Sequence, residues 1–270
     1  SRVYAAYDPD FASMALDAAY KSWEWLLSHP YIGFQNPEGS NTGDYADDSD
    51  ADERMWAAAE LLRTGDKYTD SALAELKKYA FSDIPKTDFG WTDVAGLALL
   101  SVLSDPSKKA GPEIEEIFIK ALFTDADKYV SQTKESGYFL SLLPEDFVWG
   151  SNMVVCNRSI LLILAALRSD QDQAAIYRET ALSHLHYLLG RNALGISYIT
   201  GHGEHAFKNP HNRPTAVDGI ESPMPGWLSG GPFKAPCDPK AMELIPQGTP
   251  PMKCYADVVE SYSTNEITIY

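Results

Sequence analysis

The chain has 270 residues, with 22 Lys and Arg against 38 Asp and Glu, and its formal net charge at pH 7 is -16. Negative charge on that scale argues against binding to the phosphates of a nucleic acid and to an anionic membrane surface. No apolar run reaches the ~18 residues of a membrane-spanning helix, whereas a neutral ligand such as a glycan is compatible with the composition.

Apolar residues recur at helical spacing through the first two-thirds of the chain. Two of these segments are apolar nearly all round, which predicts buried helices among amphipathic ones and hence two concentric layers. No run alternates with period two, so we predict an all-α fold with an eighth helix starting near the end of the chain. The seven expected helices span about 11–26, 50–63, 69–81, 92–103, 112–132, 151–167 and 171–189.

A long loop is expected over 191–253, which holds 10 of the 17 prolines. Loops of this length in a compact domain are usually functional or disordered. We predict a functional loop because three histidines, His202, His205 and His211, lie within it. Their spacings of three and six match no standard zinc motif.

Two carboxylates near the end of the chain suggest a chemistry. Asp257 and Glu266 are nine residues apart, with Tyr255 and Tyr262 beside them. Hydrolysis of a sugar bond uses such a pair, one acid to protonate the leaving oxygen and a second carboxylate to activate water or attack. The alternatives are a turn aspartate that binds its own backbone and a glutamate in the first turn of a helix.

The order of these residues resembles a known family. Tyr255-x-Asp257-x4-Tyr262-x3-Glu266-x-Thr268 is similar to the C-terminal active-site signature of glycoside hydrolase family 9, the (α/α)6-barrel cellulases. The stretches 197–203 and 209–214 resemble the histidine signature of that family, and further similar stretches follow in order at 52–61, 187–192 and 226–232. The resemblance implies the C-terminal part of an (α/α)6 barrel with a long active-site loop region, and inverting hydrolysis of β-1,4 bonds in cellulose or related β-glucans.

The resemblance also assigns roles to single residues. Glu266 becomes the proton donor, with Asp257 and His211 in the catalytic set. A carboxylic acid that stays neutral near neutral pH needs a raised pKa, which an enclosed site with aromatic neighbours supplies. The alternatives are surface positions for the loop residues and burial in the core for the tryptophan. The side chains expected to bind substrate are Arg213, Trp149 and Tyr262.

An acidic cluster over 44–53 provides hard oxygen ligands, for which calcium is the natural cation. The glycine and glutamate spacing of an EF-hand is absent, and a charge run is often only a solvated surface. The resemblance implies a structural calcium site formed by Thr42, Gly43, Asp52, Glu53 and Asp93.

The sequence lacks the carboxylate that would act as the catalytic base. Inverting hydrolysis needs a second carboxylate as base, and the family takes it from an Asp-Ala-Gly-Asp-like motif that this sequence lacks. We therefore expect 1–270 to be a partial catalytic domain, inactive alone, whose N-terminal part with the base motif and whose final helix lie outside the chain. That missing N-terminal part and a β-glucan are the expected partners.

Two other functions remain open. A glycan-binding relative that lost the base would share the fold, and the missing motif favours it. A polysaccharide lyase on an α/α toroid would prefer a basic cleft, which the charge of -16 disfavours. Because a polysaccharide cannot enter a cell, the hydrolase is expected to be secreted. A bridge between Cys237 and Cys254 is possible but not fixed by the sequence.

Overall fold

The computed structural model describes residues 1–31, 36–40, 47–65, 67–87, 89–90 and 93–267. They belong to two compact units, Ser1–Leu122 and Phe123–Tyr270, and the boundary falls inside helix α5 (Pro112–Glu135). None of the described helices combines the length and the hydropathy that crossing a membrane requires.

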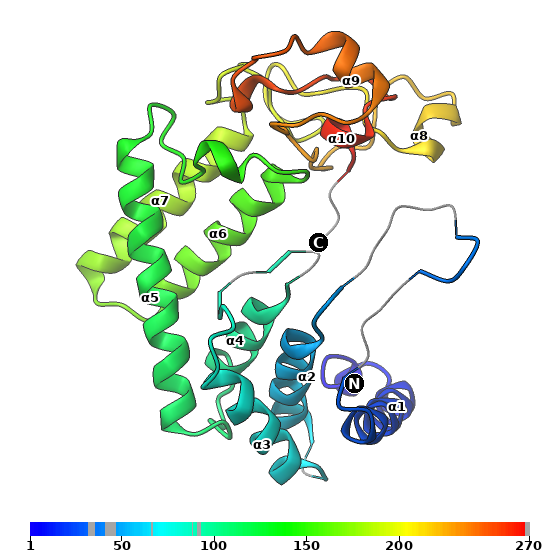
Figure 1. Cartoon of the computed structure of the whole chain (residues 1–270). Coiled ribbons are helices and arrows are strands. Elements are labelled where there is room, and N and C mark those ends of the chain that lie inside the picture. The colour runs from blue at the N-terminus through cyan, green and yellow to red at the C-terminus, as the bar shows by residue number, and fades with distance from the viewer. Residues whose placement is uncertain (32–35, 41–46, 66, 88, 91–92, 268–270) are drawn as a thin grey trace. The chain divides into compact units, whose positions relative to one another are not determined.

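The first unit is helical (Figure 1). After the short helix η1 (Tyr4–Ala6), it contains α1 (Pro9–Ser28), α2 (Ala51–Thr64), α3 (Thr69–Ala80), α4 (Ala95–Leu103) and the first part of α5. Helix α2 packs against both α3 and α4. The core between them consists of fully buried apolar side chains, among them Met55, Ala58, Leu76 and Leu99.

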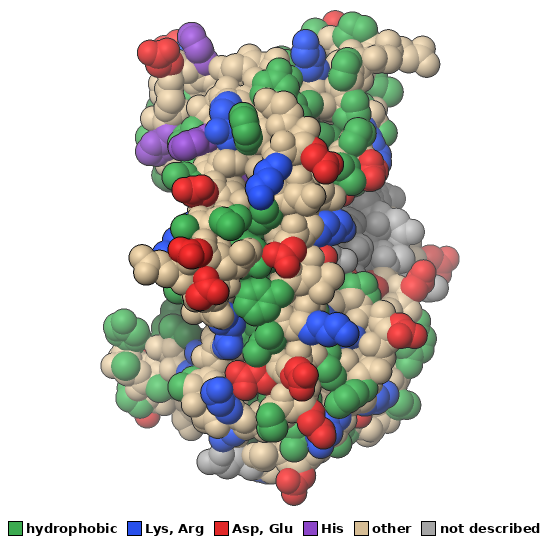
Figure 2. Space-filling model, turned by 90° about the vertical axis from the view of Figure 1, so that its left-hand side faces the viewer, with side chains coloured by type: hydrophobic (Ala, Val, Ile, Leu, Met, Phe, Trp, Pro, Cys, Tyr) green, Lys and Arg blue, Asp and Glu red, His purple; other side chains and the backbone are tan. Residues whose placement is uncertain are grey.

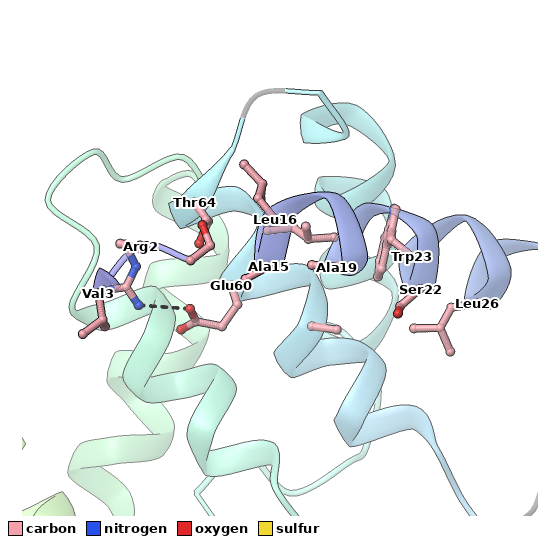
Figure 3. Close-up of a pocket in the computed structure, with 13 residues that line it drawn as sticks. Arg2, Val3, Ala15, Leu16, Ala19, Ser22, Trp23, Leu26, Glu60 and Thr64 are labelled. Carbon is pink, nitrogen blue, oxygen red and sulfur yellow. Dashed lines mark hydrogen bonds and ion pairs between the residues drawn. The ribbon is translucent and has the colours of Figure 1, made fainter. Parts of the chain in front are cut away.

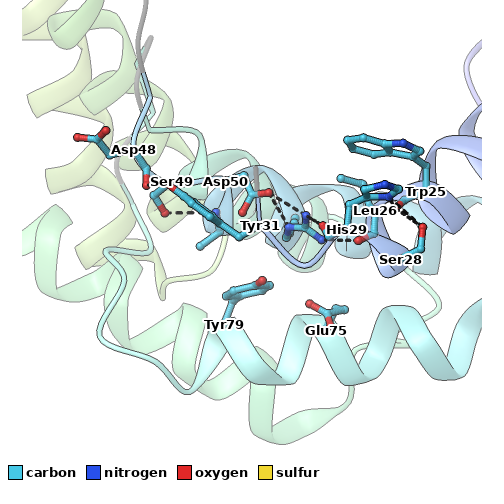
Figure 4. Close-up of polar contacts among 12 residues, drawn as sticks. Trp25, Leu26, Ser28, His29, Tyr31, Asp48, Ser49, Asp50, Glu75 and Tyr79 are labelled. Carbon is cyan, nitrogen blue, oxygen red and sulfur yellow. Dashed lines mark hydrogen bonds and ion pairs between the residues drawn. The ribbon is translucent and has the colours of Figure 1, made fainter. Parts of the chain in front are cut away.

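Arg54 ties the end of α1 to the start of α2. Its guanidinium pairs with Asp50 at 2.8 Å and donates to the carbonyl oxygen of Leu26 at 2.9 Å and to that of His29 (Figure 4). Only 5% of the arginine side chain is exposed. Because a buried guanidinium is costly unless its N–H groups are paired, these acceptors fix where the two helix ends meet.

The second unit contains the rest of α5, then α6 (Ser151–Ala166) and α7 (Gln171–Leu188), which pack against each other. The seven predicted helices are thus confirmed, with ends that differ by a few residues. The 3-10 turn η2 (Pro144–Asp146) lies between α5 and α6. After α7 follow the short helices α8 (Arg213–Val217), α9 (Pro239–Leu244) and α10 (Tyr262–Asn265), with the 3-10 turn η3 (Pro251–Lys253) before α10.

A buried histidine joins α7 to its neighbours. His184 Nε2 accepts the backbone N–H of Ser141 at 3.3 Å, and Nδ1 lies 3.1 Å from Ser159 Oγ on α6. Burial lowers the pKa of His184 to about 3, and the nearby positive charges of Arg158 and Arg191 act in the same direction. The ring is therefore neutral near pH 7, which is the form that can accept the Ser141 N–H.

The long loop region is held by isolated pairings, and no strand is formed in the described part of the chain. Four isolated bridges join residues distant in sequence, namely Ser197 with Ala206, Ile199 with Leu228, His211 with Glu266, and Ser229 with Ile267. The cysteines are free, with Cys237 exposed and Cys254 buried, so the possible bridge is not formed. On the face shown in Figure 2, acidic and basic side chains are interspersed, so the negative charge is not gathered there into one patch.

The alternative position of Glu266 in the first turn of a helix is not observed in the described residues. Helix α10 ends at Asn265, and Glu266 is extended, with φ -60° and ψ 143°. The carbonyl oxygens of both residues, which a continuing helix would use, accept N–H groups from other segments: His211 donates to Asn265 at 2.9 Å and Gly230 to Glu266 at 2.6 Å. Tertiary pairing therefore replaces the helix at this point.

Candidate active site

Glu266 lies at the surface of the second unit with its backbone held from two sides. It bridges to His211, and its carbonyl oxygen accepts the N–H of Gly230. Its Oε2 accepts the indole N–H of Trp149 at 3.0 Å, while Oε1 makes no hydrogen bond with any described residue. The side chain is exposed, so one carboxylate oxygen is held and the other can reach a ligand.

Aromatic rings stand beside this carboxylate. The ring of Trp149 lies 5.6 Å from that of Tyr262 and 6.3 Å from that of Phe233, centroid to centroid. Trp149 is 43% exposed, so it is not a core residue. Aromatic rings of this kind stack on the apolar faces of ligands, and the rings of Trp149 and Tyr262, both expected to bind substrate, lie next to each other, with the Trp149 indole bound to Glu266.

His211 is fixed in one orientation. Its backbone N–H donates to Asn265, and its Nδ1 lies 2.6 Å from the carbonyl oxygen of Val259. Because a carbonyl oxygen can only accept, Nδ1 carries a proton, and Nε2 of the neutral ring is an acceptor. The ring also packs edge-on against Tyr262 at 6.0 Å.

Asp257 binds the backbone of the histidine segment. Its two oxygens accept the N–H groups of Lys208 and Asn209, each at 2.8 Å. This differs from a turn aspartate that binds its own neighbours, since the partners lie 49 and 48 residues away. The catalytic assignment of Asp257 stays a prediction, and the bonds observed here are positioning ones.

Asn265, for which the sequence suggested no role in the site, is fully buried and connects these parts. Its Oδ1 accepts the hydroxyl protons of Tyr255 at 2.5 Å and Ser229 at 3.1 Å. Its Nδ2 donates to the carbonyl oxygen of Asn209 and to Asp257 Oδ1, the latter at 3.2 Å. The only local signal was its place directly before Glu266, since the partners are set by the tertiary fold.

Gly231 allows two segments to approach closely behind the site. Its φ is +89°, and a Cβ there would lie 2.4 to 2.6 Å from the side-chain atoms of Asn152. Asn152 is fully buried and donates to the carbonyl oxygen of Ser229 at 2.9 Å. A side chain at position 231 would therefore collide with an amide that has no room to move.

Arg213 is not joined to this group. It is the first residue of α8, is exposed, and makes no hydrogen bond or ion pair with another described residue. The helix begins there because Asn212 accepts the N–H of Thr215 at 3.2 Å and Pro214 fits the first turn. The structure thus brings together Glu266, His211, Trp149 and Tyr262, and its contacts leave the substrate role of Arg213 as a prediction.

The proposed calcium ligands lie in the first unit. Asp52 Oδ2 accepts the N–H of Val94 at 2.7 Å, which brings the residue after Asp93 to the start of α2. Burial, and secondarily the negative charge of Asp52, raises the pKa of Glu53 to about 7. Within the described ranges, no three acidic, histidine or cysteine side chains are arranged to hold a metal, and Thr42 and Gly43 lie outside those ranges.

A pocket of about 350 Å³ in the same unit is lined by residues 1–3 and by residues of α1 and α2 (Figure 3). Among the described residues that line it, Glu60 is the one carboxylate. It is paired with Arg2 at 3.0 Å and Arg63 at 3.3 Å, and accepts from Ser101. This pocket therefore offers no free acid pair for glycoside hydrolysis.

Comparison with known proteins identifies relatives over the whole chain. The model of the family described as Glycosyl hydrolase family 9 matches residues 1–270. A cellodextrinase from Butyrivibrio fibrisolvens is 40% identical over 281 residues, which cover 99% of this chain and 50% of that protein. Endoglucanase D from Acetivibrio thermocellus is 34% identical, covering 100% and 40%. The chain thus spans about half the length of these relatives.

Solved protein structures also match this chain. The GH family 9 endoglucanase J30 matches with a TM-score of 0.87 and 34% identity, covering 98% of this chain and 48% of its own. AaCel9A in complex with cellobiose-like isofagomine matches with a TM-score of 0.85 and 31% identity, covering 97% and 49%. The predicted all-α fold is confirmed, and it corresponds to about half of an (α/α)6-barrel domain.

Proposed function

Because the chain belongs to glycosyl hydrolase family 9, we propose that it is part of a catalytic domain that hydrolyses β-1,4-glucosidic bonds in cellulose or related β-glucans. The observation that carries this proposal is the carboxylate of Glu266, held at one oxygen by Trp149 and open at the other, beside the rings of Tyr262 and His211. Relatives named as a cellodextrinase and an endoglucanase support the substrate class.

In this proposal Glu266 is the general acid. It gives its proton to the glycosidic oxygen as the bond to the anomeric carbon breaks. His211, with Nδ1 bound to the Val259 carbonyl oxygen, presents Nε2 to a sugar hydroxyl, while Trp149 and Tyr262 stack on the apolar face of a sugar. Arg213 offers donors at the exposed start of α8.

In this proposal Asp257 positions the segment that carries His211. Its two bonds to the backbone of Lys208 and Asn209 hold the segment that carries His211. The water-activating base comes from the part of a complete catalytic domain that lies outside this chain, and the half-length match to the relatives supports this division. The 270-residue chain alone is then inactive, and an enzyme acting on insoluble polysaccharide is secreted.

The test compares a complete catalytic domain with the 270-residue chain on a soluble β-1,4-glucan, with products followed by NMR. We expect the complete domain to release new reducing ends that appear first as the α-anomer, because one displacement inverts the β-bond. The isolated chain should release none. First release of the β-anomer would contradict inversion, and tight glucan binding without cleavage by the complete domain would favour the glycan-binding alternative.

We also propose a structural calcium ion at the start of α2, held by Thr42, Gly43, Asp52, Glu53 and Asp93. The raised pKa of Glu53 supports it, since burial, and secondarily the charge of Asp52, oppose its ionisation, and a bound cation would relieve both. The ion would supply folding stability only. It would join the loop before α2 to the segment before α4.

Chelation tests this site. A chelator should lower the melting temperature of the chain, because a ligand at 100 times its dissociation constant stabilises the folded state by about 2.7 kcal/mol. Glu53→Gln should remove most of that sensitivity, whereas Asp70→Asn, in the first turn of α3, should keep it. Asp52→Ala is a poor probe, because it also deletes the bond to Val94. Equal melting curves with and without chelator would refute calcium.

A further inference from the structure

We propose that Trp149 positions the proton of Glu266, in addition to offering its ring to substrate. This inference rests on the proposed function, because it concerns how the same acid works. The observation is the bond of 3.0 Å from the indole Nε1 to Oε2 of Glu266, between residues 117 positions apart in the chain.

The orientation of the indole is set by its surroundings. Trp149 directly precedes Gly150, whose left-handed backbone, with φ +78°, starts helix α6. The indole ring also lies next to the rings of Tyr262 and Phe233. On the other side, the backbone of Glu266 is held by Gly230 and by the bridge to His211. Donor and acceptor are therefore each fixed by their own segment.

The chemistry of the two groups then places the proton. An indole N–H can only donate. A protonated carboxylic acid has one O–H oxygen, which is a poor acceptor, and one carbonyl oxygen, which is the better acceptor, so the carbonyl oxygen is the one favoured to face the indole. With Oε2 occupied in this way, the proton of Glu266 lies on Oε1, the oxygen that has no partner among the described residues.

The same bond changes strength during the reaction. When Oε1 passes its proton to the glycosidic oxygen, that oxygen leaves the anomeric carbon as a neutral hydroxyl, and the hydroxide part of water bonds to that carbon while its proton goes to the base. Glu266 is left as a carboxylate. A hydrogen bond to an ionised acceptor is roughly twice as strong as a neutral one, so the Trp149 N–H stabilises charge that develops in the transition state.

The bond itself can be measured in the 270-residue chain without any activity. The indole N–H resonance of Trp149 is assigned by its loss in Trp149→Phe. We expect Glu266→Ala to shift this resonance upfield, because the acceptor is gone. The matched control Glu243→Ala removes an exposed carboxylate of the same unit that pairs with Lys240, and should leave the resonance in place. A resonance that Glu266→Ala does not move would overturn the proposal.

Kinetics of a complete catalytic domain separate positioning from stacking. Trp149→Phe keeps an aromatic ring and removes the N–H, so kcat on an unactivated β-glucan should fall about 10- to 100-fold while KM changes little, as expected for one bond to a charged group. An activated aryl glycoside should lose less. A raised KM with unchanged kcat would reject positioning. If the wild-type domain proves inactive, the proposed function fails, while the NMR result still decides whether the bond exists.

Discussion

Replacing Glu266 with Gln in a complete catalytic domain is expected to lower kcat on cellulose by about 10²- to 10⁴-fold, the usual contribution of general acid catalysis. The amide oxygen of Gln can still accept the Trp149 N–H, and the amide nitrogen then takes the place of Oε1. Shape and orientation are preserved, so the loss reports the missing proton.

The size of the loss should depend on the leaving group. An alkoxide leaving from cellulose needs protonation, whereas an activated aryl oxygen needs little, so the deficit should shrink on an aryl β-glycoside. Loss of substrate positioning or of the base would reduce turnover on both substrates alike. The measurement is the ratio of wild-type to variant kcat on each substrate, with the exposed Glu260→Gln as control. Equal ratios would reject Glu266 as the acid.

Gly231→Ala is expected to be the most damaging small substitution around the site. A non-glycine residue at φ +89° costs about 1 kcal/mol or more, and the new methyl would lie within 2.6 Å of the Asn152 amide, for which overpacking adds about 1 to 3 kcal/mol. The free energy of unfolding should therefore fall by about 2 to 4 kcal/mol in denaturant titrations.

Gly226→Ala is the matched control for this substitution. Its φ is +97°, but a Cβ there meets no atom within 4 Å, so it carries the backbone cost without the collision. Asn152→Ser in the Gly231→Ala background should recover part of the loss by opening space. If the two alanine variants are equally stable, the close approach of Gly231 and Asn152 is not what makes glycine necessary.

Much of the helical fold was predictable because helix signals are local. Apolar spacing and caps such as Asp8, which accepts from Phe11 at 2.9 Å, act within one or two turns. The extended backbone of Glu266 was not predictable, because Gly230 and His211, which prevent a helix there, come from distant segments.

For the candidate site, the sequence could suggest residues but not the geometry in which they lie. The two motifs pointed to Glu266 and His211, which the structure places in one bridge. Spacing could not reveal that Asp257 binds backbone N–H groups, or that Asn265 connects both motifs, since such bonds leave no periodic pattern. The indole bond of Trp149 was equally hidden, because its acceptor is 117 residues away.

The long-range hydrogen bonds that hold the candidate site also bear on where the chain can accept inserted residues. Closing a loop of 117 residues, as between Trp149 and Glu266, costs only about 0.8 kcal/mol more than closing one of 49, as between Lys208 and Asp257. In the sequence between the bonded residues lie exposed turns such as the one at Gly219, where no atom lies within 4 Å of the position of a Cβ. Insertions at such turns would therefore lengthen the closed loops at little thermodynamic cost, while the hydrogen bonds that hold the Glu266 carboxylate and the histidine segment stay in place.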